Sequence, residues 1–434
     1  MNIVDEDLVD VDLDDDSDYE DANQIDNYEN INDNDCFFEI PLVEHSNIPF
    51  EVKDEDNIDY DKYGFKKSYK YIPKVRQEEY ENYYQRILER REQKWNVLLE
   101  ECNGEFPPMS SKLKRYIRKG IPGYIRSLCW FYYSGAKTEM ENNPGLYEKL
   151  LNYERNERNK GLTKKDSTGL DCVYAVEKDL FRTFPDNKYF AVSESILTMN
   201  DNEENSTLPN KKFYINPYIG SLRNILVAFV YYSLPKSENG YEGTCYTIGY
   251  CQSLNYIAGL LLLIFAQSNE KMFKNNPTSI EEMCFWMFAT LIDKILPKEM
   301  YGVNDMEGAV IEQELLWNLI IDENGRKFGV RKVAKWKKDM EKKNNIMNGM
   351  DDVPETHNLT KLGILTFKWM TTCFVGILPI ETVLRIWDCV FAEEGYITIL
   401  RVTLTLLRIY ENDISKNDDE LEGWDFINIY GDLF

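Results

Sequence analysis

The sequence contains very few histidines. Its 434 residues include only two, His45 and His357. A Ser-His-Asp triad, a Cys-His dyad or a histidine-rich metal site is hard to build from so few. The chain also lacks the GxxxxGK[ST] pattern whose backbone amides and lysine hold nucleotide phosphates. The sequence therefore argues against most hydrolases that act alone and against a phosphate-binding loop of its own.

Paired cysteines and long apolar runs are also missing. The nine cysteines are scattered, odd in number and form no CxxC pair, which is typical of reduced thiols in a cytosolic protein. The longest unbroken apolar stretch, residues 257–266, is too short for a transmembrane helix, which needs about 20 residues. We therefore expect a cytoplasmic protein with neither a signal peptide nor a transmembrane segment.

Basic residues are absent from the start of the chain. Residues 1–52 contain eighteen Asp and Glu residues and no Lys or Arg, within a total net charge of −25. The remaining residues carry 50 basic and 57 acidic side chains, which gives no basic face for nucleic acid. Low apolar content and high charge predict a disordered acidic tail over residues 1–70.

Apolar residues recur at helical spacing along most of the chain, whereas the alternation typical of strands is absent. A charged amphipathic helix is predicted over residues 76–105, with Tyr80, Ile87, Trp95 and Leu98 facing inward. Further helices are predicted at residues 113–119, 124–136, 146–154, 168–183, 216–233, 248–266, 283–296, 310–321, 359–374, 380–391 and 396–410. The sequence therefore predicts an all-α fold.

The main domain is predicted over residues 112–412, followed by a C-terminal tail at 413–434. A Lys-rich stretch at 323–350 is interpreted as an exposed insertion. The run Thr-Ser-Ile-Glu-Glu at 278–282 is typical of a capping box at the start of a helix.

One stretch, residues 247–265, stands at the centre of the predicted domain. It begins with small and polar residues and continues into an apolar block, which predicts a loop followed by a buried helix. Gln252 lies at the junction, where a rigid element can hold a polar group at a rim. Taken alone, these residues are also compatible with simple core packing.

Three local patterns occur in order along the chain. They are Arg126-x-x-x-Trp130, Val176-x-x-Asp179-x-x-Arg182 and Tyr250-Cys251-Gln252. Together they resemble the signature motifs of the TBC domain, the family of GTPase-activating proteins for Rab GTPases. The resemblance covers residues 112–410 and is most similar in style to the growth hormone-regulated TBC proteins.

The second pattern also has a physical meaning of its own. Asp179 and Arg182 are three residues apart on a predicted helix, so they project from one face. Most such pairs are surface ion pairs worth a few tenths of a kcal/mol. Thr-Phe-Pro follows at once, which places Arg182 on the last helical turn, where it can reach outward. An arginine finger requires such a planar, permanently charged group at a rim.

The resemblance implies roles for the site residues. Arg182 is implied as an arginine finger and Gln252 as a glutamine finger that orients the attacking water. Asp179 is implied to hold the finger helix through hydrogen bonds, and Tyr250 to support the glutamine. The residue after the glutamine is usually Gly in this family but is Ser253 here, which adds a side chain beside the finger.

The remaining matched residues are interpreted as structural. Trp130 is expected to fill the core and Arg126 to brace the neighbouring motif. The late stretch containing Arg385, Trp387 and Asp388 is similar to the C-terminal half of the family and is also interpreted as architecture.

The expected function is therefore activation of a GTP-bound Rab GTPase rather than stand-alone enzymatic activity. The chain is expected to need no cofactor, because GTP and Mg²⁺ are carried by the partner GTPase. Binding to that partner also implies peripheral association with endomembranes. A catalytically silent scaffold that binds a GTPase or a trafficking protein is the alternative. A helical hydrolase using carboxylates such as Asp179 is remote, since the chain shows no nucleophile–base pair.

Overall fold

The computed structural model describes residues 59–67, 73–193, 211–234, 247–302, 306–321, 328–335, 337–338 and 361–416. All of them belong to the second of the two compact units of the chain, residues 56–434. Predictions for the rest of the acidic tail, most of the Lys-rich stretch and the end of the C-terminal tail therefore lie outside the described residues.

The described part of the chain is helical, as predicted, and contains no β-strand beyond a single bridge between Tyr60 and Lys66. In chain order the α-helices are α2 (Lys74–Glu101), α3 (Ser111–Lys119), α4 (Gly123–Tyr133), α5 (Ala136–Asn142), α6 (Leu146–Asn159), α7 (Thr168–Leu180), α9 (Pro217–Ser233), α10 (Leu254–Ser268), α11 (Glu270–Asn275), α12 (Pro277–Thr290), α13 (Glu307–Ile321), α15 (Lys361–Thr371), α16 (Ile380–Cys389), α17 (Tyr396–Ile409) and α18 (Glu411–Lys416). One π-helical turn, Leu291–Ile295, follows α12, and another, Val390–Glu394, follows α16.

The core is built around α10, which contacts α9, α12 and α4. Its residues 257–266 are buried on every side, as expected for a helix that is apolar all round. Burial of each large aliphatic side chain contributes about 1.5–3 kcal/mol, so this helix is a main source of stability. The helix begins at Leu254, so the predicted helical start at residue 248 is wrong, and the predicted order of a loop followed by a buried helix is confirmed, with residues 247–253 as the loop.

Side-chain caps fix the starts of several helices. Asn216 caps α9 by accepting from the amides of Tyr218 at 2.9 Å and Ile219 at 3.3 Å, and Pro217 occupies the first helical position, where it needs no donor. The capping box predicted at 278–282 is wrong. The helix α12 starts at Pro277 without a side-chain cap.

Glu281, one of the two glutamates in that run, is buried and bonded to the core instead. Its carboxylate accepts from the hydroxyls of Tyr147 at 2.9 Å and Ser221 at 2.7 Å. Burial raises the pKa of Glu281 although these donors act to lower it. The residue therefore joins α12 to α6 and α9 rather than satisfying the end of its own helix.

The N-terminal helix is buried only near its C-terminal end. Trp95 and Leu98 are buried, as predicted, and the Trp95 indole donates to the Gly120 carbonyl at 2.9 Å. Tyr80 is exposed, so its predicted inward position is wrong. Trp95 packs edge-on against Tyr116 of α3, with ring centroids 5.9 Å apart, whereas Tyr80 stacks on Tyr84 of its own helix at 5.8 Å.

Two predicted exposed segments are partly buried. Within the Lys-rich stretch, Val330, Val333 and Ala334 are buried, so the interpretation of that stretch as an exposed insertion is wrong for these residues. The predicted tail up to residue 70 does not hold for residues 59–67, where Tyr63 is buried.

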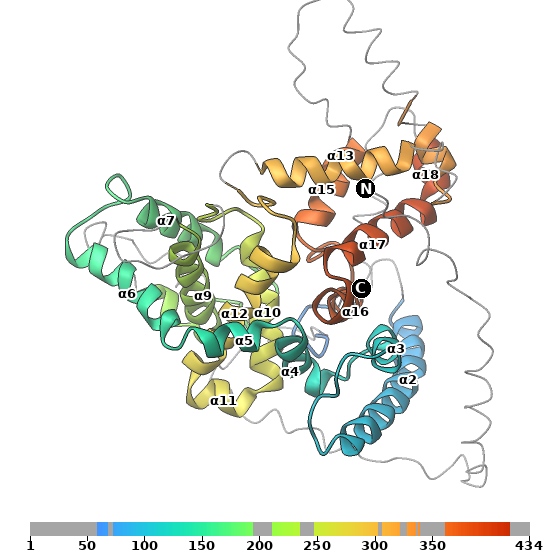
Figure 1. Ribbon diagram of the computed structural model, residues 1–434, viewed down its shortest axis with the longest axis horizontal. Helices are drawn as coiled ribbons and strands as arrows, with labels where there is room; N and C mark the ends of the chain where they lie inside the picture. The colour runs from blue at the N-terminus through green and yellow to red at the C-terminus, as the bar shows by residue number, and fades with distance from the viewer. Residues whose placement is uncertain are drawn as a thin grey trace, which may run out of the picture. The chain divides into compact units, whose positions relative to one another are not determined.

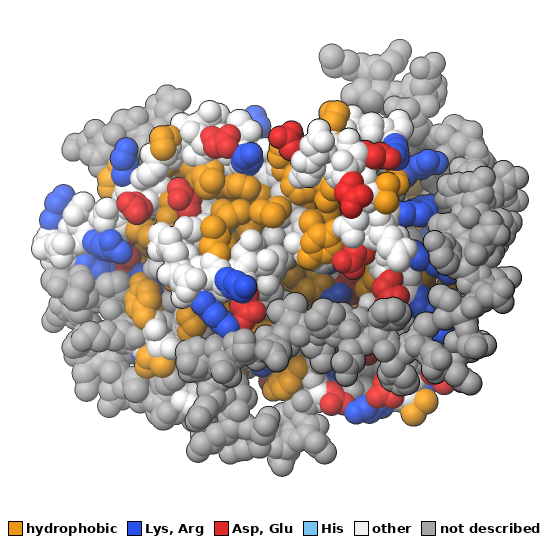
Figure 2. Space-filling view, turned by 90° about the horizontal axis from the view of Figure 1, so that it is seen from below, with side chains coloured by type: hydrophobic (Ala, Val, Ile, Leu, Met, Phe, Trp, Pro, Cys, Tyr) orange, Lys and Arg blue, Asp and Glu red, His pale blue; other side chains and the backbone are white. Residues whose placement is uncertain are grey.

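The helices form two groups that meet at α4 and α16 (Figure 1). Helices α4, α7, α9, α11 and α12 contact α10, with α5 packed against α12 and α6 against α9. Helices α13 to α18 form the C-terminal group, and α3 and α4 contact α16 and its π-helical turn. Figure 2 shows hydrophobic side chains gathered over the middle of one face, among charged ones. Among the described residues, no helix is both long and apolar enough to span a bilayer.

Candidate functional site

The candidate arginine lies on a turn at the end of α7. That helix ends at Leu180, so Arg182 follows it rather than occupying its last turn as predicted. The Arg182 amide donates to the Asp179 carbonyl at 3.1 Å and keeps the turn close to the helix. The Arg182 side chain is 72% exposed, and its guanidinium lies 3.5 Å from the Asp179 carboxylate. It is therefore presented to solvent by a fixed backbone.

The candidate glutamine lies on the loop before α10. Gln252 is exposed within this loop, residues 247–253. Gly249 has a φ of 63°, and a Cβ at this position would lie 2.7 Å from a sulfur atom of α7, so only glycine fits there. The Tyr250 hydroxyl then donates to Asp179 Oδ2 at 2.9 Å. The loop is thus fastened to the helix that leads to the candidate arginine.

The Tyr250 hydroxyl is held in its donating form. Burial raises the pKa of Tyr250, and the negative charge of Asp179 raises it further. A neutral phenol can donate to a carboxylate, whereas a phenolate would be repelled by it. The bond between Tyr250 and Asp179 is therefore stable across the whole neutral pH range.

Further hydrogen bonds join the two loops. The Asn255 side-chain amide donates to Thr183 Oγ1 at 2.9 Å, and that hydroxyl donates to the Asp179 carbonyl at 2.9 Å. The Tyr256 hydroxyl donates to the Arg182 carbonyl at 3.3 Å. The two candidate finger residues therefore extend from neighbouring loops of one hydrogen-bonded network.

Arg223 fixes the helix that carries Asp179, and the sequence analysis missed this role. It is fully buried on α9 and donates from Nε to Glu177 Oε1 of α7 at 3.0 Å and from Nη1 to Glu154 Oε2 of α6 at 3.2 Å. Glu177 lies two residues before Asp179, so this ion cluster fixes the end of α7 against two other helices. Nothing in a single sequence indicates which carboxylates an apolar helix's lone arginine will meet.

Ser253, immediately after the candidate glutamine, has a strained backbone. Its φ of 99° lies in a region that residues with a Cβ rarely adopt. The residue precedes α10 without a side-chain capping bond. The departure from the glycine expected by resemblance therefore coincides with a position where glycine is conformationally favoured.

The variant Ser253→Gly is expected to increase the free energy of unfolding by about 1 kcal/mol. Relief of about 1–3 kcal/mol of strain outweighs the extra freedom that glycine gives to the unfolded chain. Denaturant unfolding measures the change. Ser253→Ala is the matched control, because it retains the Cβ and hence the strain. Equal stabilisation by both variants would contradict the prediction.

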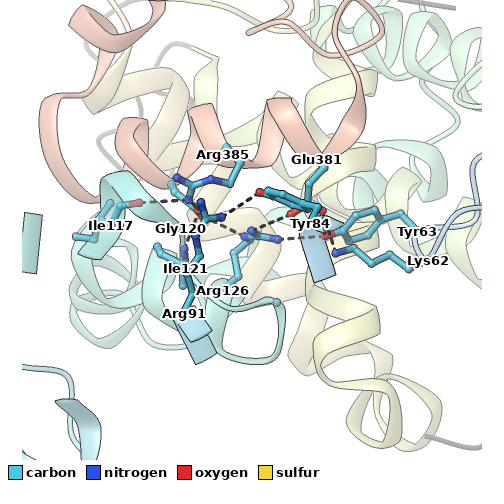
Figure 3. Close-up of polar contacts among 12 residues, drawn as sticks. Lys62, Tyr63, Tyr84, Arg91, Ile117, Gly120, Ile121, Arg126, Glu381 and Arg385 are labelled. Atoms are coloured by element: carbon cyan, nitrogen blue, oxygen red, sulfur yellow. Dashed lines mark hydrogen bonds and ion pairs between the residues drawn. The ribbon is translucent and has the colours of Figure 1, made fainter. Parts of the chain in front are cut away.

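Arg126 lies in a polar cluster between α4 and α16 (Figure 3), and the buried Trp130 of α4 bonds to the same cluster. Asp388 Oδ1 accepts from Arg126 Nε at 3.1 Å and from Trp130 Nε1 at 2.9 Å. Asp388 Oδ2 accepts from the Ile121 amide at 3.1 Å and from Arg385 Nη1 at 2.8 Å. A buried carboxylate with four donors is well satisfied. The cluster is a structural tie between the two helix groups.

Glu381 completes this cluster on its more open side. It lies 3.4 Å from Arg126 Nη2 and 3.0 Å from Lys62 Nζ. Burial acts to raise the pKa of Glu381, but the positive charges of Arg126 and Lys62 dominate and lower it to about 2. Glu381 therefore stays ionised in the folded state well below the pH at which it takes up a proton when unfolded.

This shift predicts a loss of stability in acid. A carboxyl whose pKa is lowered by folding stabilises the protein fully above its unfolded value of about 4.5, and that contribution disappears as pH falls toward about 2. Between about pH 6 and pH 3, wild type should lose about 1–2 kcal/mol more than Glu381→Gln, which cannot titrate. Denaturant unfolding over this range provides the measurement. Parallel pH profiles for the two proteins would contradict it.

Comparisons with known proteins identify a family and a fold that this chain resembles. The family model of the Rab-GTPase-TBC domain matches residues 201–327 and 352–415, which include Gln252 and Asp388 but not Arg182. The crystal structure of the Chlamydomonas flagellar RabGAP TBC domain has a similar fold, with a TM-score of 0.56 and 22% identity over 86% of this chain and 95% of that chain.

Relatives extend the similarity across most of the chain. It is 33% identical over 378 residues to GTPase-activating protein GYP3 of Saccharomyces cerevisiae, which covers 83% of this chain and 52% of that protein. It is 33% identical over 351 residues to growth hormone-regulated TBC protein 1 of Xenopus laevis, covering 81% and 77%. The chain thus spans about half the length of the yeast relative and most of the Xenopus one. It belongs to the Rab-GTPase-TBC domain family.

Proposed function

We propose that the protein is a GTPase activator for one or more Rab-family GTPases, with residues 112–412 as the active domain. One observation carries the proposal: Arg182 and Gln252 are both exposed, on neighbouring loops that Tyr250 and Asp179 fasten together. An activator that acts in trans needs such groups at its surface, held by a backbone that does not move on contact.

The proposed mechanism assigns one role to each finger. Arg182 neutralises negative charge that develops on the phosphoryl oxygens of bound GTP, which its planar guanidinium can contact through two donors. Gln252 orients the attacking water. Asp179 and Tyr250 act as positioning residues, because their hydrogen bonds set the two loops relative to one another. GTP and Mg²⁺ arrive with the partner GTPase in its GTP-bound state, and the chain contributes no cofactor.

The named activities of relatives support this proposal. GYP3 and MSB4 of Saccharomyces cerevisiae are both GTPase-activating proteins, and MSB4 is 31% identical to this chain over 381 residues. The same function places the protein in the cytoplasm, in contact with endomembranes through a membrane-bound Rab, with vesicle trafficking as the process it regulates.

The test is single-turnover GTP hydrolysis by a panel of purified Rab GTPases, with and without the full-length protein. We expect strong acceleration of one or a few of them and no hydrolysis of GTP by the protein alone. Binding of GTP-loaded Rab proteins is measured in parallel. If the protein binds one or more GTP-loaded Rab proteins but accelerates GTP hydrolysis by none of them, the activator proposal is overturned in favour of a scaffold.

A further inference from the structure

The segment Asp59 to Lys67, here called the N-terminal brace, folds on itself before α2 begins. Tyr60 and Lys66 form a β-bridge, and the Asp61 amide donates to the Phe65 carbonyl at 2.8 Å. The Asp61 carboxylate accepts from the Tyr63 amide at 2.9 Å and the Phe65 amide at 2.8 Å. These bonds fix a tight hairpin that presents Tyr63 and Phe65 to the rest of the protein.

One side of the brace contacts the chain that follows Arg182. The Lys188 amide donates to the Gly64 carbonyl at 2.9 Å, and the Asn187 side chain donates to the Tyr63 carbonyl at 3.0 Å. The ring of Phe65 packs edge-on against Phe184, with ring centroids 5.1 Å apart. The aromatic contact therefore reaches Phe184, two residues after Arg182, and the main-chain contact holds the same segment at Lys188.

The other side of the brace is anchored to the buried cluster between α4 and α16. The Tyr63 hydroxyl donates to Glu381 Oε2 at 2.9 Å and accepts from Arg126 Nη1 at 3.1 Å (Figure 3). Lys62 adds an ion pair with Glu381. Because this cluster is buried and itself tied to two helices, it gives the brace a rigid base.

Close packing allows the brace little freedom to shift. Gly64 has a φ of 83°, and a Cβ on it would lie 2.7 Å from the Tyr189 ring. A side chain at this position would therefore be strained and would also push the brace away from the turn. The hairpin fits this surface only with glycine at its tip.

The turn that the brace contacts is itself strained. Phe184 has a φ of 48°, an uncommon value for a bulky residue. Its ring is enclosed by Phe65, Phe190 and Tyr256, with centroid distances of 5.1, 5.7 and 5.5 Å. A strained conformation persists only where its surroundings enforce it. Phe184 lies two residues beyond Arg182, and Phe65 supplies one of the three rings that enclose it.

We propose that the N-terminal brace positions Arg182, by holding the strained turn at Phe184 against the cluster formed by Arg126 and Glu381. The inference rests on the proposed role of Arg182 as a finger. It adds a further element to the site: a segment far from both motifs in sequence sets the direction in which the arginine leaves the surface.

The first test uses the full-length protein without any GTPase. Hydrogen exchange of the amides at residues 182–191 is compared in wild type, Phe65→Ala and Lys66→Ala, the last being an exposed neighbour on the same hairpin. We expect exchange of the Arg182, Thr183 and Asn187 amides to become at least about tenfold faster in Phe65→Ala only. Unchanged protection in α9 and α10 controls for global unfolding.

Two outcomes of this exchange experiment would overturn the proposal that the N-terminal brace positions Arg182. One is equal protection of residues 182–191 in all three proteins. The other is faster exchange at Lys188 alone, because its amide bonds directly to Gly64 and reports only the loss of that contact. Since no GTPase is present, the result stands even if the protein activates none.

The second test separates positioning from binding. With a responsive Rab, Phe65→Ala should lower the maximal single-turnover rate by about 10- to 100-fold, because small misplacement of a reacting group has effects of this size. The half-saturating concentration should stay within about twofold, and Phe65→Tyr, which keeps the ring, should restore the rate. A rise in half-saturating concentration with an unchanged maximal rate would contradict a positioning role.

Discussion

Replacing Arg182 with alanine is expected to reduce acceleration of a responsive Rab by about 10³- to 10⁵-fold, the range of an arginine finger supplied to a GTPase. The loss should appear in the maximal rate, because the guanidinium acts on charge that develops only in the transition state. Stability should change by less than about 0.5 kcal/mol, because the side chain is 72% exposed and its ion pair with Asp179 is long.

Matched variants isolate the chemistry of this one side chain. Arg182→Lys keeps the charge but not the planar fork and should recover little of the rate. Gln252→Ala removes the proposed water-orienting group and should also abolish most of the acceleration. Arg155→Ala, at an exposed arginine of α6, should have no effect. Full acceleration by Arg182→Ala would mean that the finger is another residue or that the GTPase needs none.

Local spacing was sufficient to predict the local structure around the two candidate residues, whereas their roles were implied only by the family resemblance. The interval between Asp179 and Arg182 placed both at the end of one helix, and the switch from polar to apolar residues at Gln252 located the loop before α10. Both features depend on residues close in sequence, where helical periodicity and breaking signals apply. The exact end of α7 was not predictable to the residue, because a helix terminus depends on the contacts of the turn that follows.

Long-range partners could not be predicted from one sequence. Thr183 and Asn255 join the two loops, and both stood in stretches already singled out, yet nothing in either stretch specifies the other as its partner. The N-terminal brace was assigned to a disordered tail because its composition continues that of the acidic residues before it. Tyr63 and Phe65 become ordered only because a surface made by distant helices accepts them, which composition does not record.

The variant Asp388→Ala is expected to be the most destabilising single change in the C-terminal group. It removes the acceptor of two buried donors, Arg126 Nε and Trp130 Nε1. The guanidinium of Arg126, which is itself buried, then lacks its main counter-charge. Breaking a buried ion pair from one side costs about 3–5 kcal/mol, a large part of the stability of an ordinary domain. Asp186→Ala, at an exposed aspartate, should cost less than about 0.5 kcal/mol.

A double-mutant cycle shows whether this cost comes from the uncompensated charge of Arg126. If it does, Asp388→Ala made in an Arg126→Met background should cost markedly less than in wild type, with a coupling of about 1–3 kcal/mol. Denaturant unfolding of the four proteins provides the measurement. Additive effects would instead place the cost in the donors of Trp130 and Ile121, which lose the same acceptor.

The Arg126→Met variant also tests the N-terminal brace, because Arg126 is the donor to the Tyr63 hydroxyl. Hydrogen exchange of the amides at residues 182–191 should therefore also become faster in Arg126→Met. The variant removes one of the bonds that anchor Tyr63 of the brace, and the brace is proposed to hold the turn that follows Arg182.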